Sequence, residues 1–134
     1  MALGGIFYFY SLPNQELEKI FPATVSRDCA PWDGSAFTVT VQLDMETIVF
    51  ISVWKSPDIP SPSTFELLDE NQQIGEAYLL PTSGMRIELS GKVWFQHVEE
   101  GAPIEGRFRL TSERGEAYEG GFAAKWESPT VYCG

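Results

Sequence analysis

Strict alternation of apolar and polar residues marks the stretch SAFTVTVQL, residues 35–43. Aromatic or aliphatic side chains occupy positions 37, 39, 41 and 43, and small or polar side chains lie between them. A period of two residues is typical of a β-strand with one buried face and one solvated face. We therefore expect a strand here, preceded by the stiff turn CAPWDG at residues 29–34.

The same alternation returns in the last third of the chain, at residues 86–98, 104–110 and 117–127. Short glycine-containing links join these segments, so they are predicted to form a meander of hairpins. Glycines within such strands often mark bends that let a sheet coil around its own core. Residues 48–54 are apolar at nearly every position, which is typical of a central strand covered on both faces.

Other segments are less regular. The aromatic run Phe7–Tyr10 is expected to form a first buried strand. Residues 14–21 are the best helical candidate, with Asn14 as the N-terminal cap. The proline-rich residues 55–63 are predicted to form a long loop outside the sheet. Residues 64–81 fit either two short strands around DENQQ or a second short helix.

These patterns predict an all-β protein in a single domain spanning residues 1–134. Its 134 residues include 13% aromatics, which suit half-buried sheet surfaces. We expect an antiparallel β-sandwich or a small barrel of about eight strands, with at most one or two short helices. The alternation predicts a specific set of core residues: Phe37, Val39, Val41, Val49, Ile51, Val53, Phe95, Phe108, Leu110 and Phe122.

The two cysteines, Cys29 and Cys133, allow one intramolecular pairing. A disulfide between them would tie the chain end to the CAPWDG corner and close a loop of about a hundred residues, worth about 4–5 kcal/mol in the chain-entropy model. The alternative is two buried thiols in a cytoplasmic protein. The pairing favours an extracytoplasmic location, secreted or periplasmic, with the export signal replaced by Met1, whereas free thiols favour the cytoplasm.

Charge and hydropathy exclude several classes of partner. The formal net charge of −10 repels nucleic acids and anionic membrane surfaces. The apolar opening MALGGIFYFYSL is shorter than the ~20 residues of a spanning helix and lacks the features of a signal peptide. We expect no membrane span and no nucleic-acid partner.

The sequence offers little for catalysis. His97 is the only histidine, and it stands at the end of a predicted strand, on the inner face by alternation and near Glu99 and Glu100. Nucleophile motifs, phosphate-binding loops and dense clusters of metal ligands are missing. We therefore expect no catalytic residues, no metal and no cofactor, and hence no enzyme.

The tryptophans are the strongest functional signal. Trp94 lies between Val93 and Phe95, so it is predicted to face outward. Trp32 lies in a turn, and Trp54 and Trp126 end their strands. Exposed tryptophans stack on sugar rings or fill pockets of protein partners, although all four could instead close the core.

We favour a non-catalytic binding module that recognises a carbohydrate or a protein through Trp32, Trp54, Trp94 and Trp126. One alternative is a lipocalin-like carrier of a small apolar ligand, because antiparallel barrels of about eight strands can enclose one. Another is a structural, self-assembling subunit, such as a homodimer, because unprotected strand edges pair.

Overall fold

The described part of the chain consists of strands joined by turns and loops. A computed structural model describes residues 19–59, 63–67, 74–82 and 84–127, and no helix occurs among them. The strands are β1 (Ile20–Cys29), β2 (Ser35–Asp44), β3 (Thr47–Val53), β4 (Asp58–Ile59), β5 (Ser63–Leu67), β6 (Gly75–Pro81), β7 (Ile87–Phe95), β8 (Val98–Glu99), β9 (Ile104–Ser112) and β10 (Ala117–Trp126).

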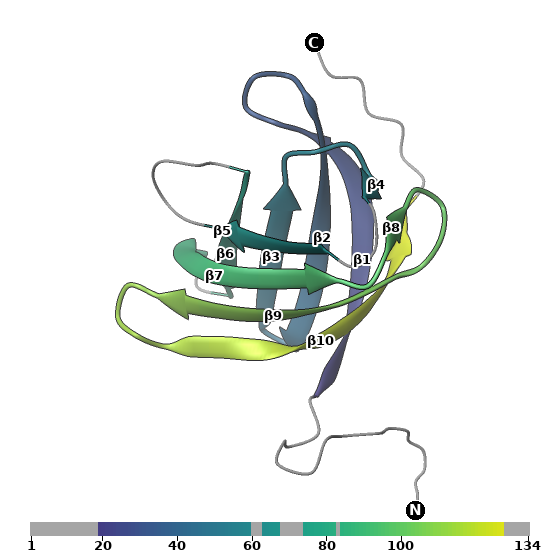
Figure 1. Ribbon diagram of the computed structural model, residues 1–134. Coiled ribbons are helices and arrows are strands. Elements are labelled where there is room, and N and C mark those ends of the chain that lie inside the picture. The colour runs from purple at the N-terminus through teal and green to yellow at the C-terminus, as the bar shows by residue number, and fades with distance from the viewer. Residues whose placement is uncertain (1–18, 60–62, 68–73, 83, 128–134) are drawn as a thin grey trace, which may run out of the picture.

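Seven of these strands close into a barrel. Neighbours follow the order β7-β6-β3-β2-β1-β10-β9, and β9 pairs back with β7 to complete the circle (Figure 1). Every pairing in this circle is antiparallel except the one between β1 and β10, which is parallel. The all-β prediction is confirmed, and of the two architectures considered the structure has the barrel.

One edge of β7 is shared by two strands. The β5 strand pairs with Gly91–Phe95 of β7, and β6 pairs with Ile87–Leu89. Beyond the barrel, β4 and β8 pair with each other as a two-stranded sheet, which lies at the right-hand edge of Figure 1. The proline-rich segment was predicted not to pair, but it contains a paired strand. Asp58 and Ile59 lie between two prolines in the sequence, and these two residues are enough for the short pairing with β8.

The barrel interior is filled by side chains. All ten predicted core residues are buried, with at most 2% of any of them exposed. The Phe95 ring lies at the centre of an aromatic cluster, with ring centroids 5.6 Å from Phe37, 5.9 Å from Phe65 and 5.9 Å from Phe122. A barrel of this strand number is just wide enough for its own side chains, and these rings use that space.

Two glycines let the strands approach closely. Gly91 has a φ of 149°, and a side chain there would collide with the carbonyl oxygen of Arg109 on β9. A side chain at Gly106 would collide with the carbonyl oxygen of Trp94 and the ring of Phe122. The glycines noted within the alternating segments therefore mark places where β7 and β9 bend around the core.

Several local predictions need correction. Ile20 and Phe21, the end of the predicted helix, belong to β1, because β1 finds two partners, β2 and β10, that local sequence does not reveal. Residues 14–18 and Phe7–Tyr10 lie outside the described residues. The apolar run 48–54 is not covered on both faces throughout, since Phe50 faces outward and stays half-exposed. The described residues in the range 64–81 form two strands, β5 and β6, and contain no helix.

Candidate functional site

A trough runs along the outer wall of the barrel where β7, β9, β10 and the start of β1 lie side by side. Its volume is about 540 Å³. Ala123 lines it with a small exposed side chain, and Gly106 lines it together with the core residues Phe95 and Phe122. Ile20, 62% exposed, borders it from β1, and Trp94, Gln96, Glu105 and Arg107 border it from β7 and β9. We call this hollow the Trp94 trough.

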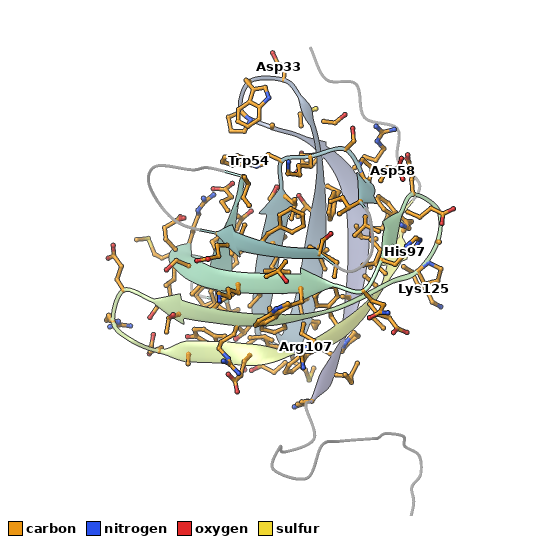
Figure 2. The ribbon with its side chains drawn as sticks, in the orientation of Figure 1. Asp33, Trp54, Asp58, His97, Arg107 and Lys125 are labelled. Carbon is orange, nitrogen blue, oxygen red and sulfur yellow. The ribbon has the colours of Figure 1, made fainter. Side chains whose placement is uncertain are left out.

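Trp94 is the aromatic wall of the trough. It faces outward as predicted, between the fully buried Val93 and the nearly buried Phe95, and is itself half-buried. Arg107 stands opposite Trp94 on the neighbouring strand, with its guanidinium 5.3 Å from the ring centroid. This cation–π contact favours the orientation that the indole has in the structure. Figure 2 labels Arg107 on the wall formed by β9 and β10.

The polar groups of the trough gather at one end. The backbone N–H of Gln96 donates to the carbonyl oxygen of Glu105 at 2.9 Å, which places these two residues side by side. Both have exposed side chains. Together with Arg107 they offer an amide, a carboxylate and a guanidinium, which are planar groups able to donate and accept several hydrogen bonds.

A second aromatic group lies at the corner between β1 and β2. Trp32 is 61% exposed, and its ring meets that of Trp54 edge to face, with centroids 5.5 Å apart. The turn is held by two backbone hydrogen bonds between Ala30 and the residues Asp33 and Gly34. A side chain at Gly34 would collide with the Trp32 indole, so glycine is required for this ring to fold over the turn.

Trp54 also lines a smaller hollow of about 310 Å³. It lies where β7 changes partner from β5 to β6, so no strand fills the wall completely at that point. Leu67 and Leu89 form apolar walls, and Glu76, Glu88 and Glu113 contribute carboxylates. We call it the Trp54 hollow.

Trp126, the last predicted binding residue, has a structural position. Its indole N–H donates to the carbonyl oxygen of Glu99 at 3.1 Å, and its ring packs 6.5 Å from that of Phe37. It is half-buried against the core. These contacts tie β8 to the end of β10, and Trp126 lines neither of the two hollows described above.

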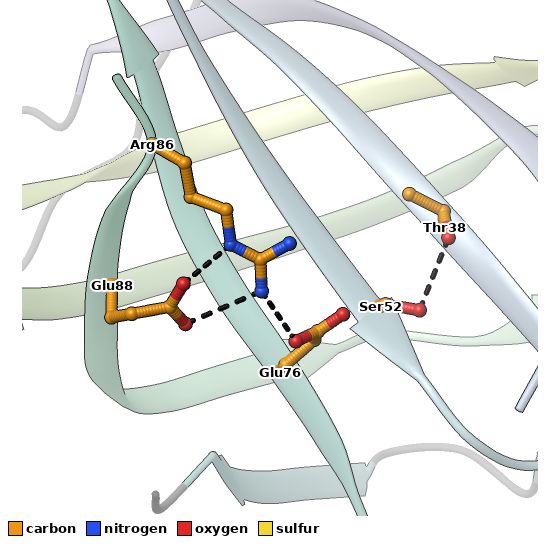
Figure 3. Close-up of polar contacts among 5 residues, drawn as sticks. All are labelled: Thr38, Ser52, Glu76, Arg86 and Glu88. Atoms are coloured by element: carbon orange, nitrogen blue, oxygen red, sulfur yellow. Dashed lines mark hydrogen bonds and ion pairs between the residues drawn. The ribbon is translucent and has the colours of Figure 1, made fainter. Parts of the chain in front are cut away.

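The opposite wall carries a stack of three flat groups. The Phe50 and Tyr78 rings lie 4.9 Å apart, and the Arg86 guanidinium lies 3.9 Å from the Tyr78 centroid. Glu76 accepts from Arg86 at 2.7 Å, and Glu88 accepts from it as well (Figure 3). These hydrogen bonds, that to Glu88 above all, raise the Arg86 pKa, whereas burial raises the pKa of Tyr78 and Arg86 partly offsets that rise.

His97 and the cysteines complete the predicted residues. His97 is exposed, because β7 ends at Phe95 and the alternation does not continue, so its assignment to the inner face was wrong. Its ring lies 3.0 Å from the Glu99 carboxylate. Cys29 is the last residue of β1, while Cys133 lies outside the described residues, so their pairing stays a prediction.

Sequence reasoning found Trp94 but missed the residues around it. Arg107, Glu105 and Ile20 come from two other strands, and only the register between strands brings them together. The one local signal is the small outward residue Ala123 on β10, which follows Gly120, Gly121 and the buried Phe122. Small residues at outward positions of a strand indicate a low point in a barrel wall.

Comparison with protein-family models, with curated proteins and with solved structures finds no match. Among the described residues, histidine, cysteine, aspartate and glutamate nowhere gather in a group of three or more that would suit a metal ion. The same part of the chain contains no helix with the length and apolarity to cross a membrane.

Proposed function

We propose that this chain is a non-catalytic binding module that recognises a carbohydrate in the Trp94 trough. The observation that carries the proposal is an outward-facing tryptophan beside a trough of about 540 Å³ with polar groups at its rim. A saccharide ring has an apolar C–H face and an edge of hydroxyl groups. The trough offers a counterpart to each of these features.

The aromatic wall suits the apolar face of a sugar. The electron-rich face of an indole attracts polarised C–H groups, and burial of that face adds hydrophobic stabilisation. Ile20 and Ala123 extend this apolar surface on the other side. Arg107 already contacts Trp94, so the indole is held in place before a ligand arrives and loses little conformational freedom on binding.

The polar rim suits the hydroxyl edge. Each hydroxyl group both donates and accepts hydrogen bonds, and the Glu105 carboxylate, the Gln96 amide and the Arg107 guanidinium match both functions. Glu105 is the one carboxylate among the described residues that line the trough. Glycoside hydrolysis generally needs a pair of carboxyl groups about the scissile bond, so this arrangement favours binding over cleavage.

The alternative of an apolar carrier has less support. A carrier needs an empty interior, but the rings of Phe37, Phe65, Phe95 and Phe122 meet at the centre of this barrel. The Trp94 trough, by contrast, is bordered by the outward-facing side chains of Trp94, Arg107 and Ala123. For this reason we place the ligand outside the barrel rather than in it.

The test is a saccharide-binding screen with the full chain and two variants. We expect at least one oligosaccharide from a panel of neutral and acidic glycans to bind, and Trp94→Ala to weaken that binding by about tenfold or more. Ala123→Leu should weaken it similarly, because the larger side chain fills the trough from an exposed position. Isothermal titration calorimetry gives both numbers.

The matched controls are Trp32→Ala and Ala117→Leu. Trp32 is an exposed tryptophan away from the trough, and Ala117 is an exposed alanine at the other end of β10. Both variants should bind saccharide as the parent protein does. A panel without any binding glycan, or equal losses in Ala117→Leu and Ala123→Leu, would contradict the proposal.

A further inference from the structure

The Trp54 hollow differs from the Trp94 trough in charge and in origin. It opens at the seam where β6 leaves β7, between Glu76 at the start of β6 and Ser90 on β7. Gly75 packs against the carbonyl oxygen of Ser52 there, with no room for a side chain. The hollow is therefore built into the barrel wall by the change of strand partner.

The chemistry of this hollow is apolar within and acidic at its border. Leu67 and Leu89 are 1% and 6% exposed and supply the apolar surface, with the half-buried Trp54 beside them. Glu76, Glu88 and Glu113 supply three carboxylates. A ligand that fits needs an aliphatic body and a positive end.

One cation of this protein already uses part of the border. Arg86 donates hydrogen bonds to Glu76 and Glu88. Glu113 forms no ion pair with any residue that the structure describes. Arg86 thus neutralises part of the charge of Glu76 and Glu88, and Glu113 adds a further negative charge among the residues that line the hollow.

Trp32 adds an independent reason to regard this corner as a contact surface. It is one of the few large apolar side chains that the described residues expose, and it rests edge to face on Trp54. Asp33 beside it has a φ of 66°, which is unusual for a residue other than glycine. Aspartate adopts this conformation in turns more readily than most residues, so the support comes from the exposed ring, because presented aromatics cluster at binding sites.

We propose that the Trp54 hollow binds a lysine side chain from a basic segment of a partner protein. The aliphatic stem lies on Leu67 and Leu89, and the ammonium group lies between the Trp54 ring and the Glu113 carboxylate. Cation–π attraction and charge pairing then act on the same group. The net charge of −10 steers basic segments toward the protein, and the exposed Trp32 contacts the residues that flank the lysine.

The test uses the blocked tripeptide acetyl-Gly-Lys-Gly-amide at millimolar concentration, observed through the tryptophan indole N–H signals in NMR spectra. We expect a saturable shift of the Trp54 signal, which Trp54→Phe identifies by its loss. Glu113→Gln should weaken binding up to about fivefold, as expected for removal of one charge at a partly exposed site. A matched peptide with norleucine in place of lysine should cause no shift.

Glu127→Gln is the control variant, because it removes the same charge at the far end of β10. It should leave the affinity within about twofold of the parent value, because Glu127 does not line the hollow and salt screens exposed charges that do not contact the ligand. Equal weakening by Glu113→Gln and Glu127→Gln would overturn the proposal in favour of the overall field. So would an equal shift with norleucine, or no shift at all. If free n-butylamine bound with the same affinity as the peptide, the assignment of a protein partner would be overturned.

Discussion

Phe95 and Trp94 are neighbours on β7 that serve opposite sides of the barrel wall. Phe95 is 1% exposed and contacts the rings of Phe37, Phe65 and Phe122. Trp94 is half-buried, and its ring contacts the guanidinium group of Arg107. The comparison shows how a small barrel can separate stability from recognition: inward residues hold the fold, and outward residues on the same strand are available for a ligand.

The outer wall is not uniform, however. Phe50 and Tyr78 also face outward, yet their rings stack on each other, and Arg86 covers the other face of Tyr78. The Thr38 hydroxyl group continues this polar wall with a hydrogen bond to Ser52 at 3.1 Å (Figure 3). Phe50 and Tyr78 are thus covered by each other and by Arg86, whereas Trp94, which Arg107 contacts, also lines the trough, and Trp32 stays 61% exposed.

The largest loss of stability should come from Phe95, the inward-facing residue of the pair Phe95 and Trp94. Phe95→Ala removes the central ring of the aromatic cluster and should lower the free energy of unfolding by about 3–5 kcal/mol. Trp94→Ala should cost clearly less, about 1 kcal/mol, because its ring is partly solvated and leaves no internal cavity. Urea denaturation followed by circular dichroism measures both. Equal losses would show that the two faces of β7 do not divide as we describe.

A glycine comparison tests the wall between these two faces. Gly91→Ala should lower the free energy of unfolding by about 2 kcal/mol or more, because the residue combines a φ of 149° with a collision against the Arg109 carbonyl. Gly84→Ala is the control, since its φ is 92° but its surroundings are open. That variant should lose only about 1 kcal/mol from the backbone conformation. A smaller loss for Gly91→Ala than for Gly84→Ala would mean that the positive φ of Gly84 in its turn matters more for stability than the close contact at Gly91.

Much of the inner face was predictable, because alternation is a local property of the sequence. Each of the strands β2, β7, β9 and β10 alternates strongly, and every core residue predicted from that pattern is buried. The β1 strand was not predictable in this way. Its sequence IFPATVSRDC contains a proline and a polar end, and its strand conformation is stabilised by pairing with β10, 101 residues further along the chain.

The outer face was predictable only one residue at a time. Alternation places Trp94 outside, but it does not say that Arg107 lies opposite or that Ala123 leaves the wall low nearby. Those facts depend on the register of β9 against β7 and β10. The Trp54 hollow depends on still less local information, because it exists only where β5 and β6 divide the edge of β7 between them.

The stack of Phe50, Tyr78 and Arg86 on the outer wall gives a prediction about the pH dependence of stability. Burial raises the pKa of Tyr78, and the Arg86 charge lowers it to a smaller extent. Arg86→Gln should therefore raise the Tyr78 pKa further and lower the free energy of unfolding by about 1 kcal/mol or less. Ultraviolet titration of the phenolate reports this pKa, and Tyr78→Phe assigns the signal against Tyr118, whose pKa burial also raises.

The sign of the pH effect follows from which form the fold prefers. A raised pKa means that the folded protein prefers the neutral phenol of Tyr78. The stability from this group is therefore fully present below the unfolded pKa of about 10 and is lost as the pH rises through the higher folded value. A Tyr78 pKa that falls in Arg86→Gln would show that the guanidinium does not act on this phenol as the stack implies.

The smallest effect should come from the β8 strand, where inward and outward residues alternate again over a very short distance. Val98 is 1% exposed, whereas the side chains of His97 and Glu99 on either side are 50% and 63% exposed. His97→Gln should change the free energy of unfolding by no more than about 0.5 kcal/mol, because solvent screens the exposed pair with Glu99. Val98→Ala should cost distinctly more, since it removes buried methyl groups. Urea denaturation of both variants decides the order: a larger loss for His97→Gln would mean that polar contacts, rather than burial of Val98, hold β8 in place.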